Sequence, residues 1–190
     1  MRALGQITGT RRGVVSGAAA TVLLATGSTL AVAGTSGALS AAGGSRAAAC
    51  ATPALGGTVV QVTELDMGMS SSMMGSRVAT MRLVASPRRV PTGIVSLLVR
   101  NQGTRTHELV ILPLAWRQVA GSRRVGGDGR VQEAGSLGEA SRTCGAGAGG
   151  GIARARTGWV TLRLATGRYE LVCNIKNHYS DGMFTELDVA

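Results

Sequence analysis

The sequence is poor in aromatic residues, poor in histidine and almost without helical periodicity. Phe, Trp and Tyr make up 3% of the 190 residues, so a core must be filled by smaller aliphatic side chains and Met. With 44% hydrophobic residues, the chain suits one globular domain and a processed leader. The scarcity of apolar residues at helical spacing disfavours a mainly helical fold.

Acidic residues are also few. Twenty Lys and Arg stand against ten Asp and Glu, which gives a formal net charge of +10. Residues 50–190 lose four of the basic residues and none of the acidic ones, which leaves +6. These charges are mostly Arg, are scattered and lack interleaved aromatics, so nucleic-acid binding is not expected. They suit a solvated exterior, and they allow weak docking to an acidic protein or an anionic membrane surface.

The first 34 residues are typical of an export signal. Residues 1–34 combine a basic start, a weakly apolar segment and an Ala-x-Ala cleavage pattern at Ala31–Ala33. Gly17, Gly27 and Ser28 interrupt the apolar segment, which disfavours a permanent membrane-spanning helix. We therefore expect a cleaved signal.

The rest of the chain divides into a flexible tether and one domain. Residues 35–56 are small and polar without periodicity, which indicates the tether, and residues 57–190 form the domain. Arg11 and Arg12 loosely resemble a twin-arginine motif, so both the ordinary and the twin-arginine export routes stay open. The expected location is extracellular, periplasmic or associated with the cell envelope.

Seven short, β-branched and often alternating segments predict an all-β fold. They are residues 58–65, 77–85, 93–100, 107–114, 159–164, 169–173 and 183–189. Seven strands of this kind indicate a β-sandwich. Residues 115–157 interrupt the pattern with a Gly-rich insertion, in which residues 132–141 are expected to hold a short helix.

The loop between the last two predicted strands contains three potential metal ligands. In the stretch CNIKNHYSDGM, Cys173, His178 and Met183 are each separated by four residues. The other histidine, His107, opens another predicted strand, and a sandwich can bring the two strand ends together. Two imidazoles, one thiolate and a weak thioether are the ligands of blue-copper electron-transfer sites, whereas zinc prefers further Cys or His. The sequence therefore predicts a mononuclear copper site.

The same residues carry a family resemblance. The stretches NQGTRTHELVILPL and GRYELVCNIKNHYSDGM closely resemble the cupredoxins, in particular small sulfocyanin-like bacterial domains, over about residues 57–190. The resemblance implies a Greek-key β-sandwich that binds one copper ion, which cycles between Cu(I) and Cu(II). Its implied ligands are His107, Cys173, His178 and Met183. Glu108 departs from the pattern, because many blue-copper proteins place Asn or Ser there to hydrogen-bond the thiolate.

Two asparagines adjoin the predicted ligands. Asn101 begins the turn before His107, and Asn174 directly follows Cys173. Both could fix the ligand loops by hydrogen bonds, and both are also ordinary turn residues.

The ligand set implies an electron carrier and not an enzyme. We expect an exported monomer that shuttles single electrons between a redox donor and a redox acceptor, which are acidic or membrane-bound. Copper oxidases and nitrite reductases of related folds need further His-ligated copper, and this chain has no third histidine. Once both histidines are assigned to a metal, no Ser–His–Asp triad is left.

A Met-rich stretch, residues 67–74, supports a second class of function. Met67, Met69, Met73 and Met74 are soft thioethers that could hold Cu(I), as in a copper chaperone or a Cu(I)-storage protein. The simpler interpretation is that they cover an apolar rim near the copper site.

The remaining cysteines, Cys50 and Cys144, have two interpretations. An exported protein can oxidise them to a disulfide, which is the first choice. Alternatively, the AAAC pattern at Ala47–Cys50 resembles a lipoprotein processing site, which would leave Cys50 acylated and the protein lipid-anchored.

Overall fold

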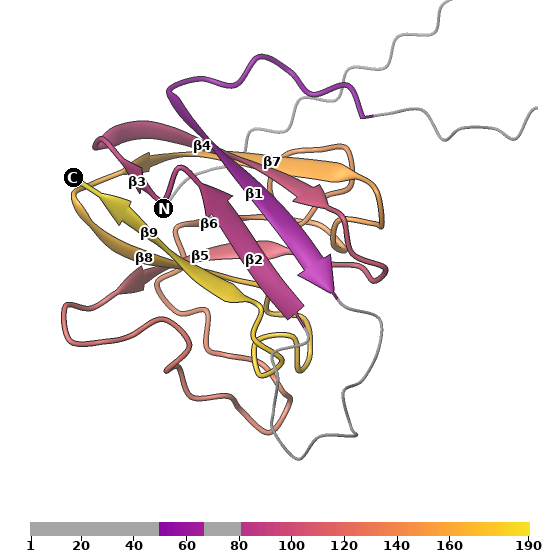
Figure 1. Cartoon of the computed structure of the whole chain (residues 1–190), viewed down its shortest axis with the longest axis vertical. Helices are drawn as coiled ribbons and strands as arrows, with labels where there is room; N and C mark the ends of the chain where they lie inside the picture. Colours follow the sequence, from indigo (N-terminus) through magenta and orange to yellow (C-terminus); the bar gives the residue numbers. More distant parts are fainter. Residues whose placement is uncertain (1–49, 67–80) are drawn as a thin grey trace, which may run out of the picture. The chain divides into compact units, whose positions relative to one another are not determined.

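Nine β-strands are formed by residues 50–66 and 81–190, which are the residues that the computed structural model describes (Figure 1). The strands are β1 (Thr58–Asp66), β2 (Met81–Ser86), β3 (Arg89–Val90), β4 (Gly93–Asn101), β5 (Leu109–Leu114), β6 (Gly138–Ala140), β7 (Thr157–Leu164), β8 (Gly167–Val172) and β9 (Phe184–Val189). All seven predicted strands are matched by a strand, although residues 77–80 of the second predicted strand lie outside the described residues. The strands β3 and β6 are two further short ones. The predicted all-β fold class is therefore confirmed.

One local prediction is wrong. The segment expected to hold a short helix, residues 132–141, contains β6 instead, and the described residues include no helix at all. Its Gly135 and Gly138 have positive φ angles of 83° and 150°, which interrupt a helix but suit a turn that leads into a short edge strand. It follows that no helix in the described part of the chain is long and apolar enough to cross a bilayer.

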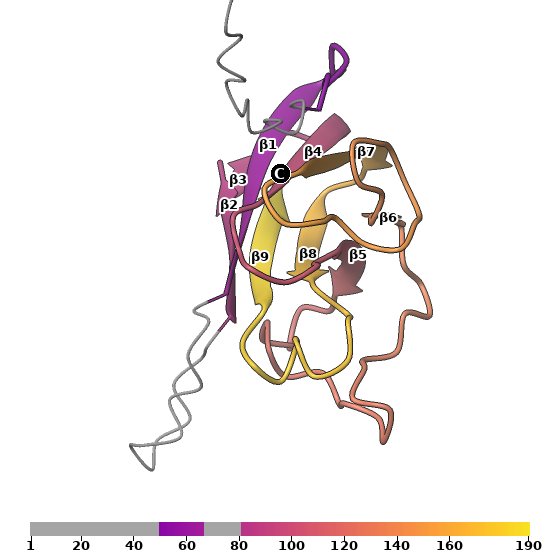
Figure 2. The same ribbon diagram turned by 90° about the vertical axis from the view of Figure 1, so that its right-hand side faces the viewer.

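The strands form two mixed sheets. One has four strands in the order β2-β1-β4-β7, and the other has five in the order β3-β9-β8-β5-β6. In the first sheet β1 runs parallel to β4, and in the second β3 runs parallel to β9, while the other pairs are antiparallel. Figure 2 shows β9, β8 and β5 side by side, with the layer of β1 and β4 next to them.

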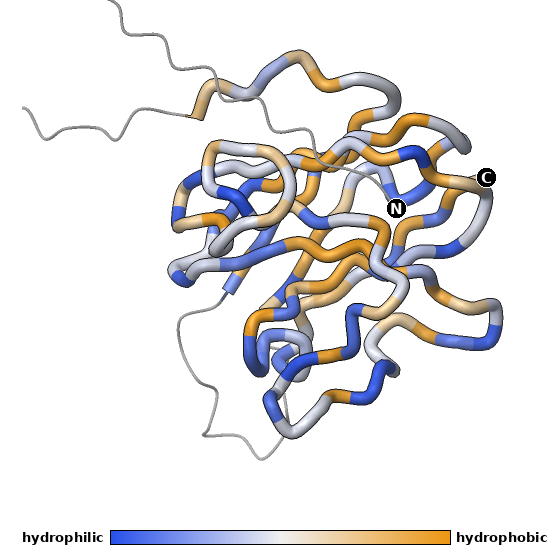
Figure 3. Tube along the Cα trace, turned by 180° about the vertical axis from the view of Figure 1, so that it is seen from behind, coloured by the Kyte–Doolittle hydropathy of each residue, from blue (hydrophilic) through white to orange (hydrophobic). Residues whose placement is uncertain are grey.

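The space between the sheets is filled almost entirely by aliphatic side chains. Alternation along β1 buries Val60 and Val62, and alternation along β4 buries Leu97 and Val99. Tyr169 is the one aromatic residue in this core cluster of the described residues. Figure 3 shows the apolar character of the strands against the polar loops that connect them. The expectation of a core filled mainly by aliphatic side chains is confirmed.

The order of the second sheet brings three strand ends together. Because β5 and β8 are antiparallel, the start of β5 lies beside the end of β8, with Val110 opposite Val172. Because β8 and β9 are antiparallel, the end of β8 lies beside the start of β9, with Val172 opposite Phe184. The predicted ligands precede β5, follow β8 and precede β9, so this sheet places all of them at one end.

The Gly-rich insertion packs back onto both sheets. Its strand β6 pairs with β5, and isolated bridges join Ala146 to Trp159 of β7 and Ile152 to His107. Part of this segment is irregular, as expected, but it is anchored by backbone hydrogen bonds such as that from Gly147 N–H to Trp159 O, at 3.0 Å.

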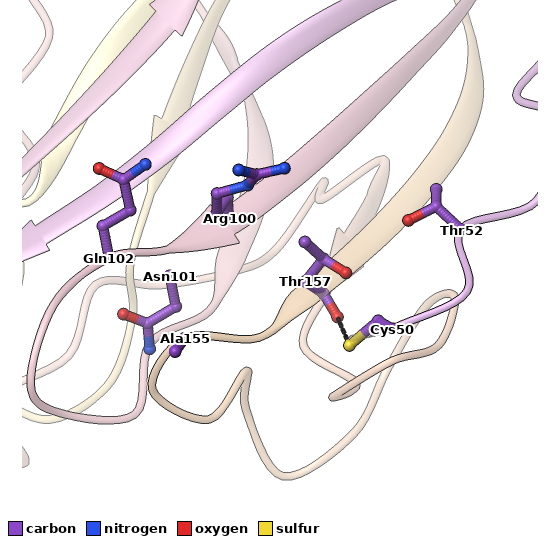
Figure 4. Close-up of a pocket in the computed structure, with 7 residues that line it drawn as sticks. All are labelled: Cys50, Thr52, Arg100, Asn101, Gln102, Ala155 and Thr157. Carbon is purple, nitrogen blue, oxygen red and sulfur yellow. Dashed lines mark hydrogen bonds between the residues drawn. The ribbon is translucent and has the colours of Figure 1, made fainter. Parts of the chain in front are cut away.

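A disulfide joins Cys50 to Cys144 in the insertion, across 94 residues of sequence. Figure 4 shows Cys50 beside Thr157 of β7, whose carbonyl oxygen lies 3.8 Å from the Cys50 sulfur. Gly56, six residues after Cys50, accepts a hydrogen bond from the Ser96 hydroxyl through its carbonyl oxygen, at 2.6 Å. The described end of the predicted tether is therefore attached to the sandwich. A sulfur in a disulfide cannot also carry a lipid, so lipid anchoring through Cys50 is not supported.

We expect Cys144→Ser to lower the free energy of unfolding by about 4.5 kcal/mol. The reason is that a bridge closing a loop of this length removes that much chain entropy from the unfolded state. Chemical denaturation of the oxidised protein and of the variant measures the difference, and reduction should weaken the parent protein alone. Exported protein whose intact mass shows both cysteines as free thiols would contradict the bridge.

Candidate metal centre

Three donor atoms from two separate parts of the chain meet at the end of the sandwich. His107 Nδ1 lies 3.3 Å from His178 Nδ1, and Cys173 Sγ lies 3.3 Å from His178 Nδ1 and 4.0 Å from His107 Nδ1. The three side chains are buried and form a group able to hold a metal ion. The sequence prediction that the two strand ends converge is confirmed for these three residues.

The triangle of donors has the right size for a metal ion. The point equidistant from the three atoms lies inside the triangle, at about 2.1 Å from each, close to metal–imidazole distances of about 2.0–2.1 Å and metal–thiolate distances of about 2.3 Å. A trigonal arrangement of two imidazoles and one thiolate is typical of blue-copper sites. The donor set therefore fits copper.

The fourth predicted ligand, Met183, closes the same loop. Met183 is fully buried, its N–H donates to His178 O at 3.0 Å, and its carbonyl accepts the N–H of Cys173 at 3.0 Å. These two bonds tie the end of the loop to its beginning. They hold Cys173 and Met183, the two ends of the loop, next to each other and to the backbone of His178.

Burial keeps the cluster neutral in the absence of metal. Desolvation raises the pKa of the Cys173 thiol to about 12, although N–H groups of Ile175 and Glu108 partly oppose the shift. Desolvation also lowers the pKa of His178 to about 4, with His107 adding to the effect. At neutral pH both imidazoles therefore offer lone pairs, and a metal ion that binds the thiolate must release one proton.

Although Glu108 replaces the Asn or Ser found in many blue-copper proteins, the Cys173 sulfur still receives a hydrogen bond at this position. The backbone N–H of Glu108 lies 3.4 Å from Cys173 Sγ, so the main chain supplies a donor whatever the side chain at this position. Burial raises the pKa of the Glu108 carboxyl, and Glu139 and Glu133 add to the shift.

Asn101 organises the turn that leads to the first histidine. Its Nδ2 donates to Arg105 O and to Ile152 O, both at 2.7 Å, and its Oδ1 accepts the N–H of Gly103 at 2.9 Å. Figure 4 shows Asn101 where β4 gives way to this turn. Ile152 in turn exchanges two backbone hydrogen bonds with His107. The role foreseen for Asn101 as a residue that fixes the loop is confirmed.

Asn174 does the same for the loop that follows β8. Val131 N–H donates to its Oδ1 at 2.8 Å, and its Nδ2 donates to Val131 O at 2.9 Å and to Glu133 Oε1 at 2.6 Å. The Gly-rich insertion therefore braces the residue next to Cys173.

Two acidic residues near the cluster were missed from the sequence. The first, Asp66, lies with its Oδ2 2.7 Å from His107 Nε2. Desolvation raises its pKa, but hydrogen bonds from Thr104, Arg105 and His107 outweigh this and hold the pKa well below its usual range. Burial lowers the pKa of His107, so the pair is a carboxylate and a neutral imidazole. Asp66 directly follows the predicted strand of residues 58–65, and nothing in the local sequence signals its contact with His107.

The second, Glu64, is fully buried, and neither of its carboxyl oxygens has a hydrogen-bond partner among residues 50–66 and 81–190. It follows Val60 and Val62 on the inward face of β1, where alternation predicts an apolar residue. Burial raises its pKa well above the usual value, and Glu108 adds to the shift. Glu64 is therefore a protonated acid at the pH where exposed carboxyls are ionised.

Comparisons with known proteins find only remote similarity. No protein-family model matches the sequence, and no curated protein matches it. Among solved structures, reduced auracyanin from Roseiflexus castenholzii is 14% identical, with 72% of this chain and 99% of that chain covered and a TM-score of 0.44. Auracyanin A, a "blue" copper protein from Chloroflexus aurantiacus, is 12% identical, with 70% and 98% covered and a TM-score of 0.41. Rusticyanin from Thiobacillus ferrooxidans is 17% identical, with 71% and 79% covered and a TM-score of 0.40.

The resemblance to the cupredoxins stands on this chain's own features. The chain folds as the expected β-sandwich and holds a His–Cys–His cluster at the predicted strand ends. The Met-rich stretch, residues 67–74, lies outside the described residues, as does the predicted export signal, residues 1–34.

We expect Glu64→Gln to change how the stability of the metal-free protein depends on pH. Above about pH 4.3 the unfolded state ionises Glu64 while the folded state keeps its proton, so the parent protein loses up to about 1.4 kcal/mol of unfolding free energy per pH unit. The variant lacks this loss. Denaturation at pH 4 should find similar stabilities, and at pH 7 the variant should be the more stable. Parallel stability curves would show that Glu64 ionises freely in the folded state.

Proposed function

We propose that this protein is an exported mononuclear blue-copper electron carrier. His107, Cys173 and His178 hold the ion, Met183 is a weaker fourth ligand, and the protein passes single electrons between a redox donor and a redox acceptor. The observation that carries the proposal is the triangle of two imidazole nitrogens and one thiol sulfur, sized for a metal ion. Copper bound by this ligand set supplies a one-electron couple between Cu(I) and Cu(II).

The surrounding chain limits rearrangement of the ligands. His107 is fixed through its backbone to Ile152, and the loop from Cys173 to Met183 is closed on itself by main-chain hydrogen bonds. Asn174 attaches that loop to the insertion. Ligands held in one arrangement by the fold suit both oxidation states, which favours fast electron transfer.

His178 is the ligand through which a partner gains access. It is 6% exposed, whereas His107 and Cys173 are both 0% exposed. Two exposed cations support docking to an acidic surface: Lys176, two residues before His178, and Arg130 in the Gly-rich insertion. We propose that the redox partners are acidic proteins or membrane-bound proteins and that the carrier acts as a monomer without catalytic activity of its own.

The leader sequence and the disulfide support a proposed location outside the cytoplasm. The Cys50–Cys144 disulfide fits an oxidising compartment outside the cytoplasm. We propose that residues 1–34 are the export signal, residues 35–56 a tether and residues 57–190 the copper-binding domain.

We expect Cys173→Ser to abolish visible colour in the oxidised, copper-loaded protein. The blue absorption of such sites is a charge transfer from thiolate to Cu(II), and Cys173 is the free cysteine of the chain. Absorption spectroscopy and metal analysis of the purified protein provide the measurement. The matched variant is Met183→Leu, which should keep the colour and raise the reduction potential, because a weak axial thioether favours Cu(II) slightly. A Cys173→Ser protein that stays blue would refute the ligand assignment.

A copper chaperone or Cu(I)-storage protein is the competing function, supported by the methionines of residues 67–74. We expect the protein to retain its copper through repeated reduction and reoxidation, because all four ligands lie in the closed end of the sandwich. Mixing the reduced protein with a Cu(I)-accepting apoprotein tests this by metal analysis of both. Replacing Met67, Met69, Met73 and Met74 by Leu is the control. Stoichiometric copper loss that this substitution abolishes would support the chaperone instead.

A further inference from the structure

We infer that Asp66 is a positioning residue of the metal centre, whose carboxylate orients His107 and favours the oxidised state of the site. It acts through the ring nitrogen of His107 that faces away from the cluster. The inference rests on the proposed function in one respect, since it takes His107 as a copper ligand. It adds a residue that neither the sequence patterns nor the ligand set contains.

The contact is short and shielded from solvent. His107 Nε2 lies 2.7 Å from Asp66 Oδ2, and the two side chains are 0% and 3% exposed. A carboxylate can only accept, so Nε2 carries the hydrogen and Nδ1 carries the lone pair. Nδ1 is the nitrogen that points toward Cys173 and His178. The hydrogen bond therefore selects the tautomer that a metal at the centre of the cluster requires.

The carboxylate is itself held in place. Asp66 Oδ2 accepts the N–H groups of Thr104 and Arg105 at 2.7 and 3.0 Å, and its Oδ1 accepts the Thr104 hydroxyl at 2.6 Å. Four donors, counting His107, converge on one side chain. Such a carboxylate has little freedom to rotate away from the imidazole, so it supplies a fixed charge rather than an occasional contact.

The fold explains why a residue 41 positions away reaches His107. Asp66 ends β1, which runs parallel to β4, so the turn after β4 lies beside Asp66. Gly103 in that turn leaves no room for a side chain, because a Cβ there would come within 2.8 Å of His107 Nε2 and closer still to Asp66 Oδ2. The turn thus fits around the Asp66–His107 pair.

The arrangement is asymmetric between the two histidines. In the part of the chain that the structure describes, no carboxylate hydrogen-bonds to His178, whose contacts are with His107 and Cys173. The negative charge therefore acts on the fully buried ligand. A carboxylate on the outer nitrogen makes an imidazole a stronger donor, which stabilises Cu(II) more than Cu(I).

The test compares Asp66→Asn and Asp66→Ala with the parent protein. Asn keeps an acceptor for Nε2–H but removes the charge, and Ala removes both. We expect the affinity for Cu(II), relative to that for Cu(I), to fall about tenfold for Asn and further for Ala. For a one-electron couple, each tenfold change raises the reduction potential by about 59 mV. Potentiometry and competition titrations with Cu(I) and Cu(II) chelators measure both quantities. Asp188→Asn, which removes an exposed carboxylate near the far end of β9, should leave the potential unchanged.

A second readout needs no metal. In the metal-free protein, ¹⁵N spectra of the His107 ring should show the Nε2–H tautomer, and Asp66→Ala should shift the ring toward a mixture of tautomers. If Asp66→Ala fails to fold, Asp66→Asn carries the test alone. A parent protein that binds no copper would overturn the proposed function and leave the tautomer result standing. A blue parent protein whose potential and tautomer are both unchanged in a folded Asp66→Asn variant would overturn the role of Asp66.

Discussion

The antiparallel placement of β8 between β5 and β9 is the constraint on which the site depends. It sets the start of β5, the end of β8 and the start of β9 at one end of the five-stranded sheet. Every proposed ligand lies either just before β5 or in the loop that connects β8 to β9. Cys173 and Met183 are then joined by a backbone hydrogen bond that continues the ladder of β8 and β9 beyond the strands. The site is thus an extension of the sheet and inherits its rigidity.

Asn101, Asn174 and Asp66 make ordered hydrogen bonds around this end of the sandwich, whereas Glu64 and Thr157 have buried side-chain oxygens without a partner among the described residues. Asn101 and Asn174 use their amides to hold backbone groups of two different loops, and Asp66 gathers four donors. Each of these buried groups would be costly if left unpaired, so each restricts the loops to the arrangement that pairs it. The Glu64 carboxyl is kept protonated, because burial raises its pKa and no partner within the described part of the chain bonds to it. Burial of Glu64 without a partner therefore lowers the free energy of unfolding.

Much of this could be predicted because it is encoded locally. Short alternating segments revealed the strands, since alternation follows directly from the pleat of a β-strand. The spacing of Cys173, His178 and Met183 in one loop indicated three of the four proposed ligands. The failures have a physical cause as well. Residues 132–141 looked helical by composition, but pairing with β5 supplied hydrogen bonds that an isolated turn of helix could not match. Asp66 and Glu64 look like ordinary strand residues, and only the packing of β1 gives each its role.

The sequence by itself determined the all-β class, the mainly aliphatic core and the choice of proposed metal donors, because these depend on side-chain chemistry and on spacing within a few residues. Only the tertiary structure decided which carboxylate reaches His107, which acid is buried without a partner and how the Gly-rich insertion braces Asn174. Those contacts join residues about 40 positions apart or more. They arise from the order and direction of strands in the sheets, which cannot be derived from the local spacing of residues.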